Sequence, residues 1–255
     1  MKLYFGLVLM FLGVASGMKC HLLGGLLSQL DAGAGQVYGV TTNDDIFRLE
    51  EDSWEHISGK LIHVSVGEVG VWGTNANNEI FKRQNGVWVL VSGRAKQVDA
   101  GGNGIVVVVN AADEVFCLNK DQTYSTDTAL SFHKLDGLLI YYSCGLYGCW
   151  GVNRNNDIFC RLDVTPENCV GSAWKSVSGK MVMLEVGSDG SVFAINTIGN
   201  VFKREGISAS NPTGDAWLLL NIPGPIKHLS FDNGVLWLIN KDNNIYKCDN
   251  PVKSA

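Results

Sequence analysis

A repeated unit constrains the fold of this 255-residue chain more than any other sequence feature. The segment Leu30-Asp31-Ala32-Gly33 recurs at 64–67, 98–101, 142–145 and 184–187, and, with the glycine lost, at 229–232. Each copy is followed by a short run ending in an aromatic residue, at Phe47, Phe81, Phe116, Phe159, Phe202 and Tyr246. These aromatic positions are 34, 35, 43, 43 and 44 residues apart. Repeats of this length that contain several short strands indicate a propeller or a solenoid.

The second unit indicates how each repeat folds. Segments 61–66, 71–74, 80–83 and 87–91 read as strands separated by turn residues, and Asn85-Gly86 is a strong hairpin signal. Four short antiparallel strands per unit are typical of a propeller blade. We therefore predict an all-β fold, a six-bladed β-propeller of four-stranded antiparallel blades.

The sixth unit ends after its third strand, so its fourth strand must come from elsewhere. In four units a bulky residue lies five positions before the glycine that ends strand four: Trp54 and Gly59, Trp88 and Gly93, Phe132 and Gly137, Trp174 and Gly179. The N-terminal segment has the same spacing, with Cys20 five positions before Gly25. We predict that residues 20–24 complete the last blade and close the ring, which removes the open sheet edge. In the fifth unit Leu219 takes the expected position, and Trp217 lies two residues earlier on the same strand face.

The seven cysteines support this closure. Cys248 is on the third strand of the last unit, beside the predicted place of Cys20, so we expect a Cys20–Cys248 disulfide. Cys144 and Cys149 flank one tight turn and are expected to pair. Cys169 lies in a long loop within reach of either Cys117 or Cys160; we favour Cys117–Cys169, which leaves Cys160 unpaired. The cysteine spacings match no zinc site, and no bound metal is predicted.

Residues 1–17 read as a secretory signal peptide. Lys2 is positively charged, residues 3–14 are apolar, and Ala15-Ser16-Gly17 supplies the small residues of a cleavage site. Residues 18–255 are then a single secreted propeller domain in an oxidising compartment. The sequence after residue 17 contains no run of eighteen apolar residues, so no membrane insertion is predicted. The formal charge of −5 argues against a nucleic-acid partner.

The recurring Asp-Ala-Gly or Ser-Val-Gly turn, the Asn-Asp-x-Ile-Phe strand and the Trp-x-x-x-Ser-Gly ending resemble tectonin repeats. The six tandem copies behind a signal peptide, together with the segments 144–150 and 234–237, resemble the secreted lectins of that family across residues 20–250. The resemblance implies a soluble propeller that binds N-acetylglucosamine-type glycans and bacterial lipopolysaccharide, in egg or innate defence.

The first predicted strand of each blade carries one set of candidate ligand residues. Its repeat-equivalent positions alternate between acids, at Asp31, Asp99 and Glu185, and hydroxyls, at Ser65, Ser143 and Ser230. Because first strands line the channel of a propeller, the three carboxylates can converge on its axis as a sugar or cation site, with calcium as a possible cofactor. The alternative is structural: each polar group accepts hydrogen bonds from a neighbouring turn.

The second predicted strand carries another set, in which an aromatic residue precedes an amide by three positions. The pairs are Trp72 with Asn75, Trp150 with Asn153, Phe193 with Asn196, and Trp237 with Asn240. A flat ring and a planar amide suit the two faces of a sugar. Alternatively, the rings pack between blades while the asparagines cap turns.

Basic residues follow the aromatic residue of the third strand, at Arg48, Lys82, Arg83, Arg161, Lys203, Arg204 and Lys247. They can contact phosphate groups of lipopolysaccharide, or they form a solvated outer face. The longer loops 121–131, 163–172 and 206–215 are candidate specificity or self-association elements, so a homo-oligomer is possible.

Catalysis is the weakest interpretation of this sequence. The chain has no Ser-His-Asp order or nucleophile elbow, and its five histidines lack metal-ligand spacing. We therefore predict a multivalent lectin and no enzyme. A protein-binding propeller scaffold and a propeller glycoside hydrolase are the alternatives.

Overall fold

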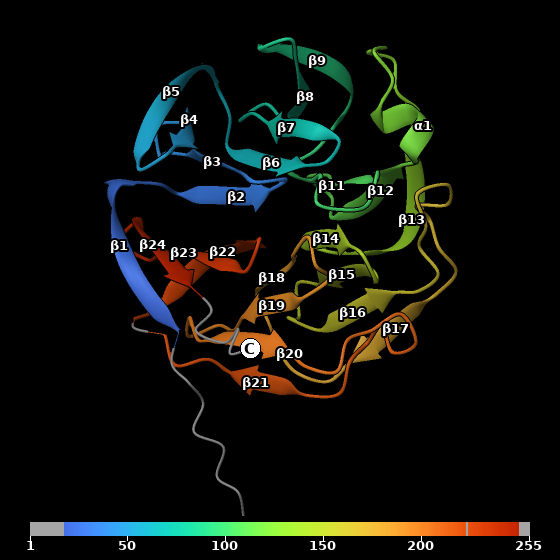
Figure 1. Ribbon diagram of the computed structural model, residues 1–255. Helices are drawn as coiled ribbons and strands as arrows, with labels where there is room; N and C mark the ends of the chain where they lie inside the picture. The colour runs from blue at the N-terminus through green and yellow to red at the C-terminus, as the bar shows by residue number, and fades with distance from the viewer. Residues whose placement is uncertain (1–17, 223, 250–255) are drawn as a thin grey trace, which may run out of the picture.

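The computed structural model describes residues 18–222 and 224–249, which form six four-stranded sheets arranged around a central axis (Figure 1). The predicted signal peptide, residues 1–17, lies outside the described residues. All strand pairs are antiparallel. The six-bladed β-propeller predicted from the repeats is confirmed.

Each blade runs outward from the axis in chain order. Blade 1 contains β2 (Gln29–Gly33), β3 (Gln36–Val40), β4 (Asp45–Glu50) and β5 (Ser53–Lys60). Blade 2 contains β6 (His63–Gly67), β7 (Gly70–Thr74), β8 (Glu79–Gln84) and β9 (Val87–Arg94). Blade 3 contains β10 (Gln97–Asp99), β11 (Val106–Val109), β12 (Glu114–Leu118) and β13 (His133–Leu138), with the short helix α1 (Lys120–Thr123) between the last two.

The second half of the ring repeats this order. Blade 4 contains β14 (Tyr141–Gly145), β15 (Gly148–Val152), β16 (Ile158–Arg161) and β17 (Trp174–Val177). Blade 5 contains β18 (Met183–Val186), β19 (Val192–Ile195), β20 (Val201–Arg204) and β21 (Trp217–Leu219). Blade 6 contains β22 (Ile226–Asp232), β23 (Val235–Asn240), β24 (Asn244–Asp249) and the N-terminal strand β1 (Lys19–Leu26).

The N-terminal strand closes the ring as predicted. β1 pairs with β24 along its length, and Cys20 lies directly opposite Cys248 in the register. The two cysteines form a disulfide across a sequence separation of 228 residues. The last blade therefore combines the two ends of the described chain and has no unpaired inner strand (Figure 1).

The core lies between blades, because each innermost strand is sandwiched by its neighbours. β2 and β6 are buried at every position, whereas the outer strands β5 and β9 are largely exposed. Polar and apolar residues alternate along both inner strands, and both kinds are buried, because each face of an inner strand contacts protein.

A tryptophan over a glycine joins successive blades on the outside. In three blades the indole N–H of this tryptophan donates a hydrogen bond to a backbone carbonyl of the preceding blade. The pairs are Trp54 with Gly24 (3.0 Å), Trp174 with Asp136 (2.8 Å) and Trp217 with Ser178 (3.0 Å). Trp217 also lies opposite Arg204, as Trp174 lies opposite Arg161. Trp217, rather than Leu219 at the spacing-matched position, therefore fills the aromatic position of blade 5.

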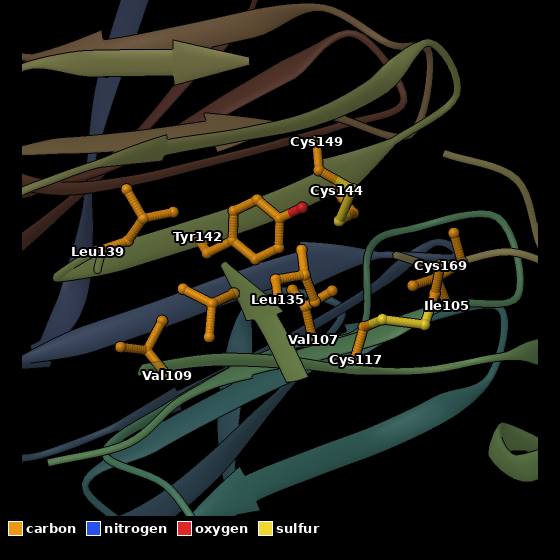
Figure 2. Close-up of a cluster of buried hydrophobic side chains, with 11 residues drawn as sticks. Ile105, Val107, Val109, Cys117, Leu135, Leu139, Tyr142, Cys144, Cys149 and Cys169 are labelled. Atoms are coloured by element: carbon orange, nitrogen blue, oxygen red, sulfur yellow. A yellow bond between two sulfur atoms is a disulfide. The ribbon is translucent and has the colours of Figure 1, made fainter. Parts of the chain in front are cut away.

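Two further disulfides lie in one hydrophobic cluster between blades 3 and 4 (Figure 2). Cys117 on β12 pairs with Cys169 in the 163–172 loop, and Cys144 pairs with Cys149 across the hairpin of β14 and β15. Cys160 is a free, buried thiol. All three predicted pairings and the odd thiol are confirmed.

Candidate functional site

The acids and hydroxyls of the innermost strands form a hydrogen-bonded ring around the axis. Asp31 accepts the Ser65 hydroxyl at 2.8 Å, the Val66 N–H at 2.6 Å and the Ser230 hydroxyl at 2.8 Å. Asp99 in turn accepts the Ser143 hydroxyl and the Cys144 N–H, both at 3.0 Å. Asp31 and Asp99 thus link neighbouring blades, which matches the structural interpretation of these two residues.

Burial changes the protonation of this ring, because an ionised carboxylate is poorly solvated there. Burial raises the pKa of Asp31, and burial together with the charge of Asp31 raises the pKa of Asp99 to about 8. Burial and the two neighbouring acids raise the pKa of Glu185 well above its ordinary range. The ring is therefore held partly protonated at neutral pH.

Below the ring of acids and hydroxyls lies a layer of aromatic side chains. It is formed by His63, Tyr141 and His228, each two residues before the serine of the innermost strand in blades 2, 4 and 6. The ring centroid of His63 is 5.9 Å from that of Tyr141 and 6.2 Å from that of His228. Burial lowers the pKa of His63 to about 4 and that of His228 well below its ordinary value. Both imidazoles are neutral at physiological pH.

A cavity of about 160 Å³ opens above the acids at the end of the axis. Asp31 and Glu185 border it, and Glu68, Asn103 and Ser188 add polar groups. Of the three predicted axial acids, Asp31 and Glu185 therefore reach a cavity, while Asp99 is not among its lining residues. In residues 18–222 and 224–249, no group of three or more His, Cys, Asp or Glu is arranged to hold a metal ion.

The aromatic–amide pairs do not form an exposed sugar surface. Trp72 and Trp150 are each 1% exposed, and Phe193 and Trp237 are also buried. The amide oxygen of each partner asparagine accepts two backbone N–H groups of its own turn, as at Asn75, Asn153, Asn196 and Asn240. Asn110 of blade 3 makes the same contacts. The packing and turn-capping interpretation accounts for the whole set.

Several of the basic residues are also buried, in contrast to the expected solvated face. Lys82 donates to the carbonyls of Ser125 (2.7 Å) and Asp127 (2.5 Å), while Arg161 and Arg204 are 4% and 7% exposed. The long loops cover these cations and supply their acceptors. A repeat pattern alone does not reveal this, because the long loops occur only in blades 3 to 5 and lie outside the repeated segments.

A crevice between blades 2 and 3 was not predicted from the sequence. It measures about 240 Å³ and is lined by Ile80, Gly93, Arg94, Val108, Asn110, Phe116 and Phe132. Phe132 takes the place that tryptophan holds at 54, 88, 174 and 217, and both phenylalanines are partly exposed. Since phenylalanine is smaller than tryptophan, this substitution is the sequence signal that marks the crevice.

The described residues contain no helix long and apolar enough to cross a membrane. A closed ring of six four-stranded repeats, with cavities at its axis and between blades, defines a β-propeller suited to ligand binding. The Tectonin domain model matches residues 26–241, and the chain belongs to this family.

Comparisons with known proteins agree with this assignment. The chain is 47% identical over 234 residues to the fish-egg lectin of Cyprinus carpio, which covers 91% of this chain and 98% of that protein. It is 36% identical over 75 residues to the perivitellin-2 31 kDa subunit of Pomacea maculata, covering 29% and 26% of the two chains. The fold is similar to virginiamycin B lyase from Staphylococcus aureus, with a TM-score of 0.57, 16% identity and coverage of 93% and 90%. At that identity the likeness concerns the fold alone.

Proposed function

We propose that this protein is a secreted, non-enzymatic lectin that binds N-acetylglucosamine-type glycans, including those of bacterial lipopolysaccharide, in egg or innate defence. The observation that carries the proposal is the 47% identity to a fish-egg lectin across 98% of its length. Three disulfides support secretion, because such bonds persist in oxidising compartments.

The crevice between blades 2 and 3 is the sugar site that the geometry favours. Phe116 and Phe132 offer rings to the C–H face of a pyranose, and Arg94 offers hydrogen-bond donors at the rim. Ile80 and Val108 supply an apolar floor for an acetamido methyl group. The axial cavity, bordered by Asp31 and Glu185, is a second polar site that a sugar hydroxyl can enter.

Single-sugar binding in such a shallow site should be weak, with a free energy of roughly 4–6 kcal/mol. Strong attachment then depends on several sites engaging one surface at once, through a homo-oligomer or through repeated sites on one ring. We therefore expect the intact protein to agglutinate cells that carry the glycan, with weak inhibition by the monosaccharide.

The sharpest test replaces Phe132 in the crevice with tryptophan, the residue that other blades have at this position. Phe132→Trp places an indole where Trp174 and Trp217 donate to a carbonyl of the preceding blade. The fold should therefore tolerate it while the crevice closes. We expect binding to N-acetylglucosamine, measured by calorimetry, to fall at least tenfold while the melting temperature is retained.

The matched control is Trp54→Phe, the reverse exchange at the equivalent position of blade 1, outside this site. Unchanged sugar affinity in Phe132→Trp would move the site elsewhere, with the axial cavity tested next by Glu185→Gln. An added EDTA arm reports any calcium dependence. Absence of binding to any glycan by the intact protein would favour a protein-binding scaffold, and turnover of a sialoside would favour a hydrolase.

A further inference from the structure

Three blades carry an arginine stacked on a tryptophan at the same repeat position. The guanidinium carbon lies 5.5 Å from the ring centroid for Arg83 and Trp88, 5.0 Å for Arg161 and Trp174, and 5.2 Å for Arg204 and Trp217. In each case the two residues lie directly opposite each other on the third and fourth strands. The three pairs are therefore equivalent, and their surroundings can be compared.

For two of these arginines the protein itself supplies hydrogen-bond acceptors to the guanidinium group. Arg161 donates through Nη1 to Asp136 Oδ1 at 2.8 Å and through Nε to the Val170 carbonyl at 2.7 Å. Arg204 donates to the carbonyls of Thr213 (2.8 Å) and Gly214 (3.3 Å). The carbonyl partners lie in the long loops of blades 4 and 5, so these loops bury the two cations and accept their hydrogen bonds, while the carboxylate that pairs with Arg161 comes from Asp136 on β13.

Arg83 has neither kind of partner. Its blade replaces the long loop with the tight Asn85-Gly86 turn, so no loop carbonyl is available. Asp136 precedes Gly137 on the outer strand of blade 3. On the outer strand of blade 1, which faces Arg83, the equivalent residue before Gly59 is Ser58. Among residues 18–222 and 224–249, the side chain of Arg83 makes no hydrogen bond or ion pair, yet the residue is half-buried.

This unpaired guanidinium faces a hollow of about 380 Å³ between the outer strands of blades 1 and 2. β5 contributes Glu55, His56, Ile57 and Ser58, and blade 2 contributes Arg83, Gly86, Val87 and Trp88. Glu55 is the one acid of this lining, and its carboxylate is bound by Arg48 at 2.8 Å. Arg48 also pairs with Glu50 at 2.7 Å, so its one positive charge is shared between two carboxylates. Among residues 18–222 and 224–249 no carboxylate forms an ion pair with Arg83, and the exposed apolar side chain of Val87 lines the same hollow.

We propose that this hollow binds the anionic group of an acidic sugar, a carboxylate or a phosphate, through Arg83. The protein itself presents the same chemistry between blades 3 and 4, where the Asp136 carboxylate binds Arg161. An arginine fork held over an indole is suited to bidentate recognition of either anion, and Val87 with the edge of Trp88 gives the sugar an apolar contact. This inference rests on the proposed lectin function and extends it to a third, charge-selective subsite.

The test compares glucose, glucuronate, glucose 6-phosphate and inorganic phosphate by calorimetry at one low salt concentration. We expect at least one acidic sugar to bind at least tenfold more tightly than glucose. Arg83→Gln should abolish that difference. Ser58→Asp should abolish it as well, because it supplies an internal carboxylate as Asp136 does, and it should leave the melting temperature unchanged or raised.

Lys180→Gln is the matched control, since it removes the same charge from an exposed lysine of another blade pair. The proposal is overturned if Arg83→Gln and Ser58→Asp bind acidic sugars like the wild type, or if Lys180→Gln weakens binding equally. Equal affinity for inorganic phosphate and glucose 6-phosphate would overturn the sugar assignment. N-acetylglucosamine binding should survive in Arg83→Gln, so failure here is distinct from failure of the lectin function.

Discussion

The thiol of Cys160 lies 3.8 Å from the backbone carbonyl oxygen of Pro212. Cys160 lies 43 residues after Cys117, and Pro212 lies 43 residues after Cys169; Cys117 and Cys169 form a disulfide. This offset of 43 residues is the repeat period in this part of the chain. The loops that contain Cys169 and Pro212 have the same offset, because the isolated β-bridge Thr165–Asn168 in the first recurs as Ser208–Asn211 in the second. Pro212 thus occupies the place of a missing cysteine, and Cys160 is half of an unmade disulfide.

Pro212→Cys should therefore complete a fourth disulfide with Cys160. The new bond closes a loop of the same length as the existing one, worth about 4 kcal/mol in the chain-entropy account. We expect loss of the titratable thiol in the denatured protein and a higher melting temperature without reductant. The double variant Cys160→Ser with Pro212→Cys is the control, and an unchanged melting temperature in the single variant would contradict the repeat alignment.

The axial acids predict how stability varies with pH. Burial raises the pKa of Asp99 to about 8, whereas an unfolded aspartate titrates near about 3.9. Between these values the folded protein keeps a proton that the unfolded chain has released, so stability falls as pH rises. The lowered pKa values of His63 and His228 oppose this trend only below about 6.5, the unfolded histidine pKa.

From pH 6.5 to 8 we therefore expect the free energy of unfolding to fall, by at most about 1.4 kcal/mol per pH unit for each proton involved. Asp99→Asn removes one such proton and should flatten the slope. Urea unfolding at several pH values measures this. A slope that is equally steep in Asp99→Asn would mean that other groups carry the effect.

The turn asparagines should matter for stability and not for ligand binding. Asn153→Ala removes the acceptor for the backbone N–H groups of Asn155 and Asp157. By analogy with other capping side chains, the expected loss is about 1–2 kcal/mol. Denaturant unfolding and N-acetylglucosamine calorimetry on the same sample check both halves of the prediction. A weakened sugar affinity in a folded Asn153→Ala protein would restore the aromatic–amide pairs as candidate sites.

Close contact between the innermost strands requires a glycine at position 33. A β-carbon there would lie 2.0 Å from the Val66 carbonyl oxygen, which is backbone of the next blade. Gly33→Ala should destabilise the protein by about 3 kcal/mol, because the two strands must separate. Gly24→Ala is the matched control, since a β-carbon at position 24 meets nothing within 4 Å. Thermal unfolding of both variants distinguishes crowding from a general effect of losing a glycine.

The architecture was predictable because it depends on features that recur at a fixed spacing. The spacing of Cys20 and Gly25 identified the closing strand, and the cysteine positions led to the three disulfides. Both are properties of the repeat, so six copies reinforce one another. The tryptophan at 217 shows the limit: its loop shifted the spacing by two residues, while strand pairing with Arg204 kept its place.

The site was less predictable, because binding surfaces here arise where blades differ. A repeat highlights what all units share, and shared residues such as Trp72 and Asn75 serve the fold. The crevice beside Phe132 and the hollow beside Arg83 each depend on one exception: a smaller ring and a missing acid. Whether such an exception opens a cavity depends on loop packing that single-sequence patterns do not contain.

Because β1 is the first strand to emerge during synthesis and its partner β24 is the last, the ring cannot shut until nearly the whole polypeptide has been translated. A chain that stops before blade 6 leaves the apolar faces of blades 1 and 5 uncovered and Cys20 without its partner. Such a product exposes apolar surface and is open to aggregation. The junction of the two ends is therefore among the last contacts that a newly made copy can form.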